Sequence, residues 1–258
     1  MKGTVLYEVN DGVAVLTVDN PPVNPLSDGV RNGLYESLQK AEDDNTVKGV
    51  VLTGKGRAFI AGADISEFGG NVEGKSLNEV FQKLEFCKKP VVAAINGIAL
   101  GGGLETALCC NYRIIDKSAI VGLPEVNLGL LPGGGGTQRL PRLAGPSEAL
   151  KMMLTGSHVP AQKALNLGIV NSISDDVVAE SIEFIKEVAE KTDDHPKVRD
   201  FNEKMMEARG DDKVLLEAQA MASKGRKGQF APGQIIKCVE AAINMDDFDE
   251  GLKKEGEY

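Results

Sequence analysis

The chain has 258 residues, 42% of them apolar, and its 29 basic and 38 acidic residues give a formal net charge of −9. A chain of this length and composition can bury one sizeable core, or a core and a smaller appended domain, so disorder is not expected. The negative charge disfavours nucleic acid and anionic membrane as partners, and any polyanionic ligand must meet a local basic patch.

No segment of the sequence has the pattern of a secretory signal or a membrane span. Residues 1–20 alternate polar and apolar types, and no apolar run approaches the roughly 20 residues that a membrane helix needs. The cysteines have no CxxC spacing, which argues against a zinc site and a disulfide framework. We therefore expect a soluble protein without a metal, in a reducing compartment, with the cytoplasm as the default. The cysteines are Cys87, Cys109, Cys110 and Cys238.

The first 54 residues predict a hairpin, a helix and a buried strand. Two short β-branched segments flank an Asn-Asp-Gly turn at 10–12, which is typical of a β-hairpin. After a Pro-rich loop, Ser27 or Asp28 can cap a helix that reaches Ala41 with one apolar face. Residues 49–54 are apolar and β-branched, and we expect them to form a buried strand.

From residue 77 to residue 174 helical and strand patterns alternate. This alternation predicts an α/β core, because helices must cover the faces of a mainly parallel sheet. The expected elements are a helix over 77–87, a strand over 91–96, a helix over 102–110, a strand over 112–116, helices from 137 and over 147–154, and a strand near 169–174.

Everything after Val177 is predicted to be helical. The last 60 or so residues are rich in Lys, Glu, Met and Ala, and they are broken near His195, Gly210 and Pro232. We therefore predict an α/β core over 1–195 that carries the active site, and a helical C-terminal subdomain over 196–258.

The first of three glycine-rich segments lies at 61–67. Small residues there precede an Asp-x-x-Glu pair, Asp64 and Glu67, which can form a capping box for a following helical turn. Small side chains let a ligand approach the backbone amides closely, and the start of a helix favours negative charge. The alternative is an ordinary glycine turn before a capped helix.

The second glycine-rich segment joins a strand to an apolar helix and ends at Glu105. Three consecutive glycines at 101–103 are costly in backbone entropy, and such a cost is tolerated where a ligand must touch the main chain. Glu105 follows Gly102 by three positions, so we expect its carboxylate near the Gly102 amide. The apolar neighbours predict that this carboxylate points into a pocket, where desolvation raises its pKa. The alternative is a solvated surface glutamate.

The third segment, at 123–139, contains Glu125 and four glycines at 133–136. Glu125 is the only charged residue between Lys117 and Arg139. Taken alone, it could equally be a solvated loop glutamate or a buried helix cap.

The three segments together resemble the crotonase superfamily of enoyl-CoA hydratases and isomerases. They are AGADISEF at 61–68, NGIALGGGLE at 96–105 and GLPEVNLGLLPGGGGTQRLPR at 122–142. The resemblance spans essentially the whole chain and is closest to the N-terminal hydratase/isomerase module of multifunctional fatty-acid β-oxidation enzymes. It implies an α/β fold of the ClpP/crotonase type, with a spiral core of repeated ββα units and a C-terminal helical subdomain.

The resemblance also assigns roles to residues. It implies that the amides of Ala63 and Gly102 form an oxyanion hole for a thioester carbonyl, with Glu105 and Glu125 on either side of one water. Glu125 matches the position that exchanges a proton with C2, and Glu105 matches its partner that orients and activates water. Gly133 matches a glycine whose amide helps to hold Glu125. The implied substrate and coenzyme A contacts are Ala61, Gly62, Asp64, Ile65, Gly101, Pro124 and Gly133.

The implied activity is hydration of trans-2-enoyl-CoA to 3-hydroxyacyl-CoA, with Δ3-Δ2 isomerisation as a side reaction. The family generally needs only the Glu125 position for isomerisation, so the presence of both glutamates favours hydration. Coenzyme A is then part of the substrate and no separate cofactor is expected. A homo-oligomer, a trimer or a dimer of trimers, is implied as well. The alternatives on this scaffold are an isomerase, a thioester hydrolase, a decarboxylase, or a non-catalytic acyl-CoA-binding protein.

The sequence departs from the family at Ser66, a position that is often basic in hydratases and lies near the nucleotide phosphates. Coenzyme A affinity must then come from other basic residues. The candidates are Arg57, Lys88, Lys89, Lys253 and Lys254.

Three other motifs in the sequence point to different functions. Residues 69–76 satisfy the phosphate-loop pattern GxxxxGK[ST], but the pattern requires a preceding buried strand, and Glu73 would put a carboxylate among phosphates. A Ser-His-Asp hydrolase is disfavoured because only His158 and His195 are available and there is no GxSxG elbow. The glycines at 133–136 lack the preceding strand that a dinucleotide fingerprint needs.

Overall fold

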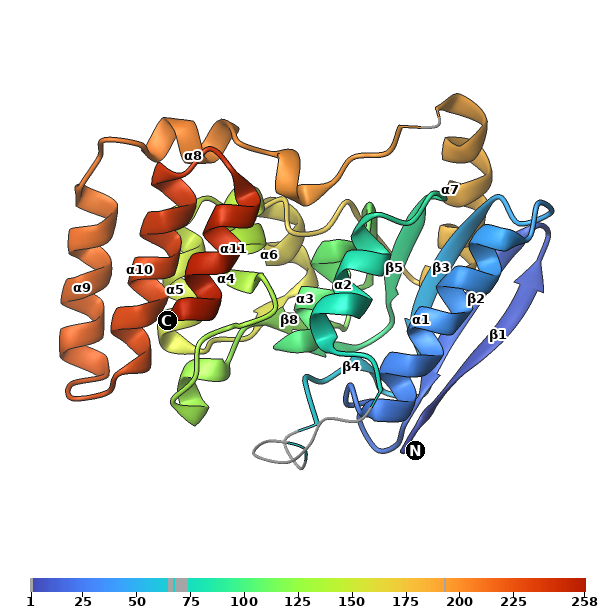
Figure 1. Ribbon diagram of the computed structural model, residues 1–258, viewed down its shortest axis with the longest axis horizontal. Helices are drawn as coiled ribbons and strands as arrows, with labels where there is room; N and C mark the ends of the chain where they lie inside the picture. Colours follow the sequence, from blue (N-terminus) through green and yellow to red (C-terminus); the bar gives the residue numbers. More distant parts are fainter. Residues whose placement is uncertain (1, 65–66, 68–73, 193) are drawn as a thin grey trace.

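The computed structural model describes residues 2–64, 67, 74–192 and 194–258. Its core contains a six-stranded sheet in the order β1-β2-β3-β5-β7-β10 and a four-stranded sheet in the order β4-β6-β8-β9. In Figure 1 the larger sheet lies on the right, and the C-terminal helices lie on the left. The active-site segments run between these two regions.

The chain begins with the predicted hairpin. Strands β1 (Thr4–Asn10) and β2 (Val13–Asp19) are antiparallel, with Asn10 opposite Val13. Asp11 and Gly12 both have positive φ, 49° and 78°, as the tight turns that match the twist of a hairpin require. The Asn-Asp-Gly turn at 10–12 was therefore interpreted correctly.

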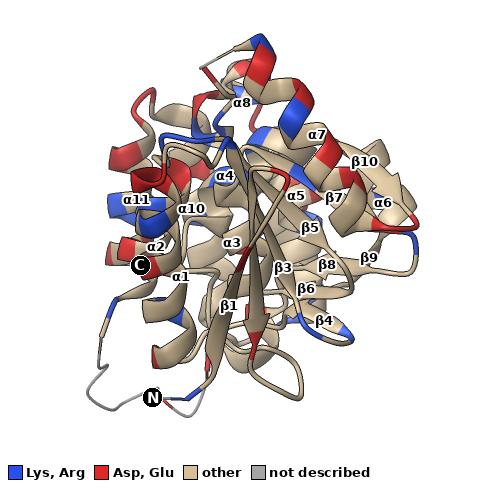
Figure 2. Cartoon of the chain, turned by 90° about the vertical axis from the view of Figure 1, so that its right-hand side faces the viewer, with Lys and Arg blue, Asp and Glu red and all other residues tan. Residues whose placement is uncertain are grey.

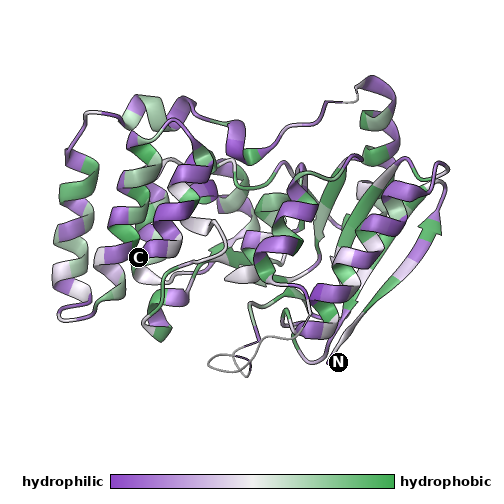
Figure 3. Ribbon diagram, in the orientation of Figure 1, coloured by the Kyte–Doolittle hydropathy of each residue, from purple (hydrophilic) through white to green (hydrophobic). Residues whose placement is uncertain are grey.

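The other strands of the large sheet run parallel to β2. They are β3 (Gly49–Gly54), β5 (Val91–Ile95), β7 (Tyr112–Asp116) and β10 (Ser172–Ser174). Every residue of β3 and β5 is buried, because both faces of a parallel sheet are covered. Helix α7 (Val177–Lys191) packs on one face through Ile185, and the main core lies on the other. Figure 3 shows these central strands as strongly hydrophobic.

The smaller sheet gives the fold its repeat. Each of β3, β5 and β7 is followed by a strand of the smaller sheet and then by helical structure, which confirms the expected ββα units. The pattern of the sequence did not predict these strands, because three residues are too few to show alternation. The strands are β4 (Ala58–Ile60), β6 (Ile98–Leu100), β8 (Ile120–Gly122) and the two-residue β9 (Val159–Pro160).

The core helices begin and end close to the predicted positions. They are α1 (Asp28–Asp43), α2 (Leu77–Glu85), α3 (Gly102–Cys109), α4 (Gly136–Ala144) and α5 (Pro146–Thr155). Two further elements were not predicted, the 3-10 helix η2 (Glu125–Leu128) and helix α6 (Ala161–Asn166).

The helical turn that Asp64 and Glu67 were expected to cap lies mostly outside the described residues. The Glu67 carboxylate accepts a hydrogen bond from the Asp28 amide at 2.9 Å and pairs with Arg31 at 2.6 Å. It therefore supports the start of α1, which is far away in sequence but adjacent in space. A capping box does form at Ser76 and Glu79, where α2 begins.

All elements after β10 in the described residues are helical, as predicted. Helix α10 packs against α4 and α5, and α11 packs against α10 and α4. Figure 2 shows that charged residues gather on α7 and α11, whereas the central strands carry few. Within the described residues, no helix is both long and apolar enough to cross a bilayer. The elements are η3 (Val198–Asp200), α8 (Glu203–Ala208), α9 (Lys213–Gly225), α10 (Ala231–Asn244) and α11 (Phe248–Glu257).

A buried arginine ends helix α3. The Arg113 guanidinium donates to the carbonyls of Cys110 at 2.8 Å and Ile169 at 2.8 Å. The side chain is fully buried, and burial lowers its pKa to about 10. Carbonyls at a helix C-terminus need donors, and a cation there also interacts favourably with the helix dipole. Arg113 therefore fixes the far end of the helix that carries Glu105.

We expect Arg113→Ala to lower the free energy of unfolding by about 3 kcal/mol, because it leaves buried carbonyls without donors and opens a cavity. Urea titration followed by circular dichroism measures this change. Arg57→Ala, which truncates an exposed arginine, is the control and should stay within about 0.5 kcal/mol of the wild type. Equal effects of the two substitutions would contradict a capping role for Arg113.

Candidate active site

A cavity of about 810 Å³ lies among the loop after β4, the start of α3, the η2 loop and helices α10 and α11. Most of the residues predicted for the site line this cavity. They are Ala61, Gly62, Ala63, Gly101, Gly102, Glu105, Pro124, Glu125 and Gly133. Three separate glycine-rich segments thus meet in one place.

The two amides expected to form an oxyanion hole lie next to each other. A β-carbon built on Gly102 would stand 3.4 Å from the Ala63 nitrogen, and one on Gly103 would stand 1.8 Å from the Ile60 carbonyl oxygen. The first turn of α3 therefore presses directly against the end of β4, and a side chain at Gly103 would force the two apart. No hydrogen-bond acceptor for the Ala63 or Gly102 amide is found among the described residues. Ala63 and Gly102 both line the cavity.

Glu105 is buried, and its carboxylate is held by the glycine loop. Its Oε1 accepts hydrogen bonds from the amides of Gly134 at 2.8 Å and Gly136 at 2.9 Å. A β-carbon on either glycine would stand within 2.7 Å of a Glu105 carboxylate oxygen, so only glycine lets the loop approach. We expected this carboxylate near the Gly102 amide; its hydrogen bonds go to the facing glycine loop.

Glu125 faces the same cavity from the start of η2. A β-carbon on Gly101, which has a φ of 54°, would stand 3.0 Å from Glu125 Oε1. Its other oxygen, Oε2, is buried and has no hydrogen-bond partner among the described residues. The resemblance assigned a Glu125-holding amide to Gly133. Two amides of this loop donate hydrogen bonds to a carboxylate of α3. They belong to Gly134 and Gly136, and the carboxylate is that of Glu105.

The two glutamates differ in how well a negative charge on each is stabilised. Burial and the nearby Glu105 carboxylate raise the pKa of Glu125 to about 8. Burial also raises the pKa of Glu105, but the amides of Gly136 and Gly134 and the charge of Arg139 oppose this. We assign the shared charge to Glu105 and the proton to Glu125, since hydrogen bonds to the charged form favour it. The pair then holds one base and one acid near neutral pH.

The helical tail supplies cavity residues that sequence reasoning did not identify. Phe230, Gln234, Glu255 and Tyr258 from α10, α11 and their flanks all line the cavity. Glu255 is 3% exposed, and burial and Glu105 raise its pKa to about 8. Nothing in the local pattern of α11 distinguishes Glu255 from its solvated neighbours, because its burial depends on where the helix docks.

Some predicted contacts lie elsewhere. The Asp64 carboxylate is buried and pairs with Lys2 at 2.9 Å, and Asp64 does not line the cavity. Ile65 and Ser66 lie outside the described residues. Lys89 donates to the carbonyls of Ala41 and Asp44, which occupies its ammonium group.

None of the other basic candidates lines the cavity either. Arg57 and Lys88 are exposed, Lys254 pairs with Glu257 at 2.6 Å, and Lys253 lines a different cavity. None of the five basic candidates is therefore placed at the cavity.

The rival motifs gain no support from the described residues. Of the phosphate-loop pattern at 69–76, Gly74, Lys75 and Ser76 are described. Lys75 pairs with Glu79 at 2.9 Å, and Ser76 caps α2. Neither His158 nor His195 lines the cavity.

Comparison with known proteins gives a consistent family. The model of the enoyl-CoA hydratase/isomerase family matches residues 8–231. The peroxisomal bifunctional enzyme of Danio rerio is 42% identical over 253 residues, which covers 97% of this chain and 35% of that enzyme. The fatty acid oxidation complex subunit alpha of Shewanella frigidimarina is 42% identical over 256 residues, which covers 91% of this chain and 35% of that subunit. The chain thus spans about a third of the length of these relatives.

Solved structures agree with the sequence matches. An enoyl-CoA hydratase from Bacillus anthracis is similar with a TM-score of 0.68 and 30% identity, and the match covers 98% of this chain and 96% of that one. The resemblance drawn from the three glycine-rich segments and the expected fold class are both confirmed.

The raised pKa of Glu125 makes stability depend on pH in a definite direction. In the unfolded chain this carboxyl ionises near its ordinary value of 4.5, but in the folded protein it does so near 8. The stability that this carboxyl contributes to the folded protein is fully present below its unfolded-state pKa. It is lost as the pH rises through its folded-state pKa. We therefore expect Glu125→Gln to become more stable than the wild type as pH rises from 5 to 9.

Thermal unfolding at a series of pH values measures this difference. Glu8→Gln, a substitution at an exposed position of β1, is the matched control and should show a constant offset. A constant difference between Glu125→Gln and the wild type from pH 5 to 9 would show that Glu125 does not keep its proton in the folded protein.

Proposed function

Because this chain belongs to the enoyl-CoA hydratase/isomerase family, we propose that it adds water across the double bond of a trans-2-enoyl-CoA thioester. The addition is syn and gives a 3-hydroxyacyl-CoA. The observation that carries the proposal is the unequal pair of glutamates in one cavity with two available amides. Glu105 accepts two amide hydrogen bonds, whereas Glu125 Oε2 is buried without a partner among the described residues.

The amides of Ala63 and Gly102 polarise the thioester in this proposal. Nucleophilic attack at C3 pushes electron density onto the carbonyl oxygen, and the two N–H donors stabilise the enolate that forms. Fixed donors need no reorganisation during the reaction, and losing one typically lowers the rate by about 10²–10³-fold. The close packing of Gly103 against Ile60 supports this role, because it holds β4 and α3 in register.

The two carboxyl groups divide the proton transfers. The Glu105 carboxylate takes one proton from water as the water oxygen bonds to C3. The protonated Glu125 then gives its proton to C2, and the enolate collapses to the saturated thioester. One proton of the water stays on the oxygen as the new 3-hydroxyl, and the other ends on Glu105. Glu125 is left ionised, and proton exchange with solvent returns the pair to its starting state. A general acid with a pKa near the working pH is effective in such a step.

Isomerisation of a 3-enoyl-CoA is a second reaction that the same site supports. A Glu125 that exchanges its proton near neutral pH can move a proton between C2 and C4 without help from water. The specific support is its raised pKa, about 8, together with its unpartnered oxygen.

The apolar rim of the cavity suits an acyl chain. Leu128, Leu130 and Phe230 line it and are 64%, 42% and 75% exposed, which is unusual for large apolar side chains. We propose the acyl-CoA thioester as the partner, without a separate cofactor.

The remaining parts of the proposal concern assembly and compartment. We propose a homo-oligomer, a trimer or a dimer of trimers, supported by exposed Met206 and Leu216 on the tail helices, 59% and 61% exposed. The cysteines are all unpaired, which supports a reducing compartment such as the cytoplasm. Some of the relatives are named as peroxisomal enzymes. Mass measurement in solution tests the oligomer.

Loss of crotonyl-CoA absorbance on adding the protein tests hydration directly. We expect Glu125→Gln to lower hydration and isomerisation alike, because both need a proton at C2. We expect Glu105→Gln to lower hydration by about 10²–10⁴-fold, the usual contribution of a general base, and isomerisation far less.

Glu8→Gln serves as the control and should leave both rates unchanged. Equal losses of hydration and isomerisation in Glu105→Gln would refute the division of roles. A wild-type protein that binds acyl-CoA without changing it would refute the enzymatic proposal and support a binding protein.

A further inference from the structure

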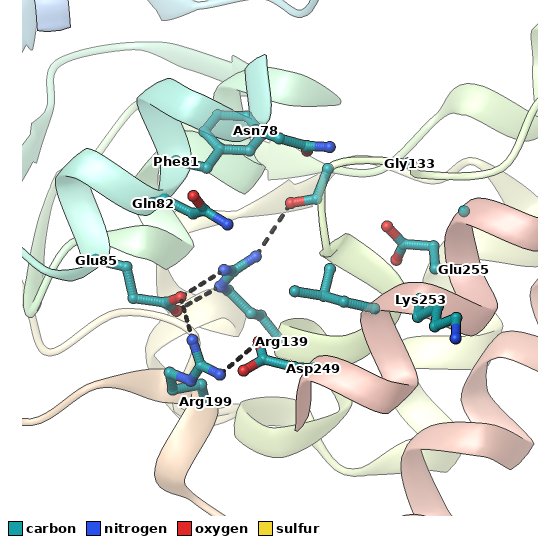
Figure 4. A pocket seen from close by; sticks show the side chains of 13 residues that line it. Asn78, Phe81, Gln82, Glu85, Gly133, Arg139, Arg199, Asp249, Lys253 and Glu255 are labelled. Carbon is teal, nitrogen blue, oxygen red and sulfur yellow. Dashed lines mark hydrogen bonds and ion pairs between the residues drawn. The ribbon is translucent and has the colours of Figure 1, made fainter. Parts of the chain in front are cut away.

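The last helix contributes a buried carboxylate to the loop that holds Glu105. Glu255 of α11 is 3% exposed, and its Oε1 accepts a hydrogen bond from the Gly135 amide at 2.7 Å. Its Oε2 accepts hydrogen bonds from the Thr137 amide at 3.3 Å and from the Thr137 hydroxyl. Figure 4 shows this carboxylate pointing from α11 towards the glycine loop.

Four consecutive amides at the start of α4 are divided alternately between two carboxylates. The amides of Gly134 and Gly136 donate to Glu105, whereas those of Gly135 and Thr137 donate to Glu255. The left-handed conformation of Gly135, with a φ of 87°, contributes to this alternation. The loop is therefore clamped from both sides, and neither set of hydrogen bonds can shift without disturbing the other.

The two oxygens of Glu255 meet three polar groups of the loop, which are the amides of Gly135 and Thr137 and the Thr137 hydroxyl. The Gln138 side chain donates to Thr137 Oγ1 at 3.0 Å and to the Cys238 carbonyl at 2.9 Å, which fixes the position of that hydroxyl. Thr137 and Gln138 are fully buried. Removing the Glu255 carboxylate would leave two buried amides and a hydroxyl without their acceptor, so the loop would have to move or admit water.

The back of the loop is braced by a separate set of contacts. Arg139 donates to the Gly134 carbonyl at 3.1 Å and forms a bidentate ion pair with Glu85, both at 2.9 Å. Arg199 joins this network and pairs with Asp249 of α11 at 2.6 Å (Figure 4). The Asp249 side chain is 70% exposed and is linked to the loop only indirectly, through Arg199, Glu85 and Arg139. Its ion pair is therefore expected to contribute little to stability, as is usual for exposed pairs.

We propose that Glu255 is a positioning residue for hydration. It fixes residues 134–137 and so aims the amides that hold Glu105, which means that α11 must be docked for the catalytic base to be in place. Glu255 also lines the cavity next to Glu105, yet the mechanism gives it no proton to transfer. The inference rests on the proposed hydratase function for its kinetic part only.

The test compares Glu255→Ala with Asp249→Asn, two substitutions on one helix. For Glu255→Ala we expect kcat to fall about 10²-fold with KM little changed, since a small displacement of a catalytic group has an effect of this size. Asp249→Asn should retain the wild-type kcat and KM. Glu255→Gln has the same shape, keeps one acceptor oxygen, and should fall between the wild type and Glu255→Ala; it also covers the case in which the alanine variant fails to fold.

A double substitution shows whether Glu255 acts through Glu105. We expect Glu105→Gln combined with Glu255→Ala to lose no more hydration than Glu105→Gln alone, because residues that act as a unit are not additive. Independent, multiplied losses would overturn the proposal. So would a raised KM at unchanged kcat in Glu255→Ala, or an equal loss in Asp249→Asn.

Amide hydrogen exchange gives a readout that does not depend on activity. We expect faster exchange in residues 134–137 of Glu255→Ala and of Glu255→Gln, and wild-type exchange in Asp249→Asn. If the wild type hydrates no enoyl-CoA, the hydratase proposal fails. Hydrogen exchange still tests whether Glu255 fixes residues 134–137. Unchanged exchange in the Glu255 variants would overturn the inference.

Discussion

Two hydrogen bonds, from the amides of Gly134 and Gly136 to Glu105, govern the chemistry of the site. Glu105 and Glu125 line one cavity, and two neighbouring carboxylates in such a place cannot both carry charge at low cost. Hydrogen bonds from the amides of Gly134 and Gly136 stabilise the ionised form of Glu105, so the proton remains on Glu125. Because the donors belong to the backbone, the difference between base and acid depends on loop geometry rather than on the two side chains themselves.

The ββα repeat brings the remaining parts of the site together. Parallel pairing of β4 with β6 places the residues after each strand side by side, so Ala63 and Gly102 meet although they are 39 positions apart in the sequence. Arg113 ends α3, and the contact between Gly103 and Ile60 fixes its start. The tail then closes the arrangement through Glu255. The two amides that we propose as oxyanion donors therefore depend on the core alone, whereas the glutamate pair depends on both the core and the docked tail.

Much of this could be predicted from the sequence, because glycine runs and lone charges in apolar segments are local signals. The hairpin, the buried strands and the expectation that Glu105 points into a pocket follow from such signals. The meeting of the three glycine-rich segments with Glu125 in one site was implied only by the resemblance to the family. The short strands β4, β6 and β8 do not follow from local signals, since pairing rather than pattern defines them. The partners of Glu105 were also missed, because the direction of its side chain depends on a loop 29 residues away. Glu255 is polar in a charged helix, and only docking makes it buried.

The most direct test of the unequal pair is to titrate the two carboxyl groups separately by 13C NMR, with glutamate labelled at the side-chain carbonyl. Glu105→Gln and Glu125→Gln assign the two resonances. We expect the Glu105 resonance to move at lower pH than that of Glu125, and the Glu125 resonance to move near pH 8. A Glu125 that ionises at its ordinary value, or before Glu105, would contradict the assignment of base and acid.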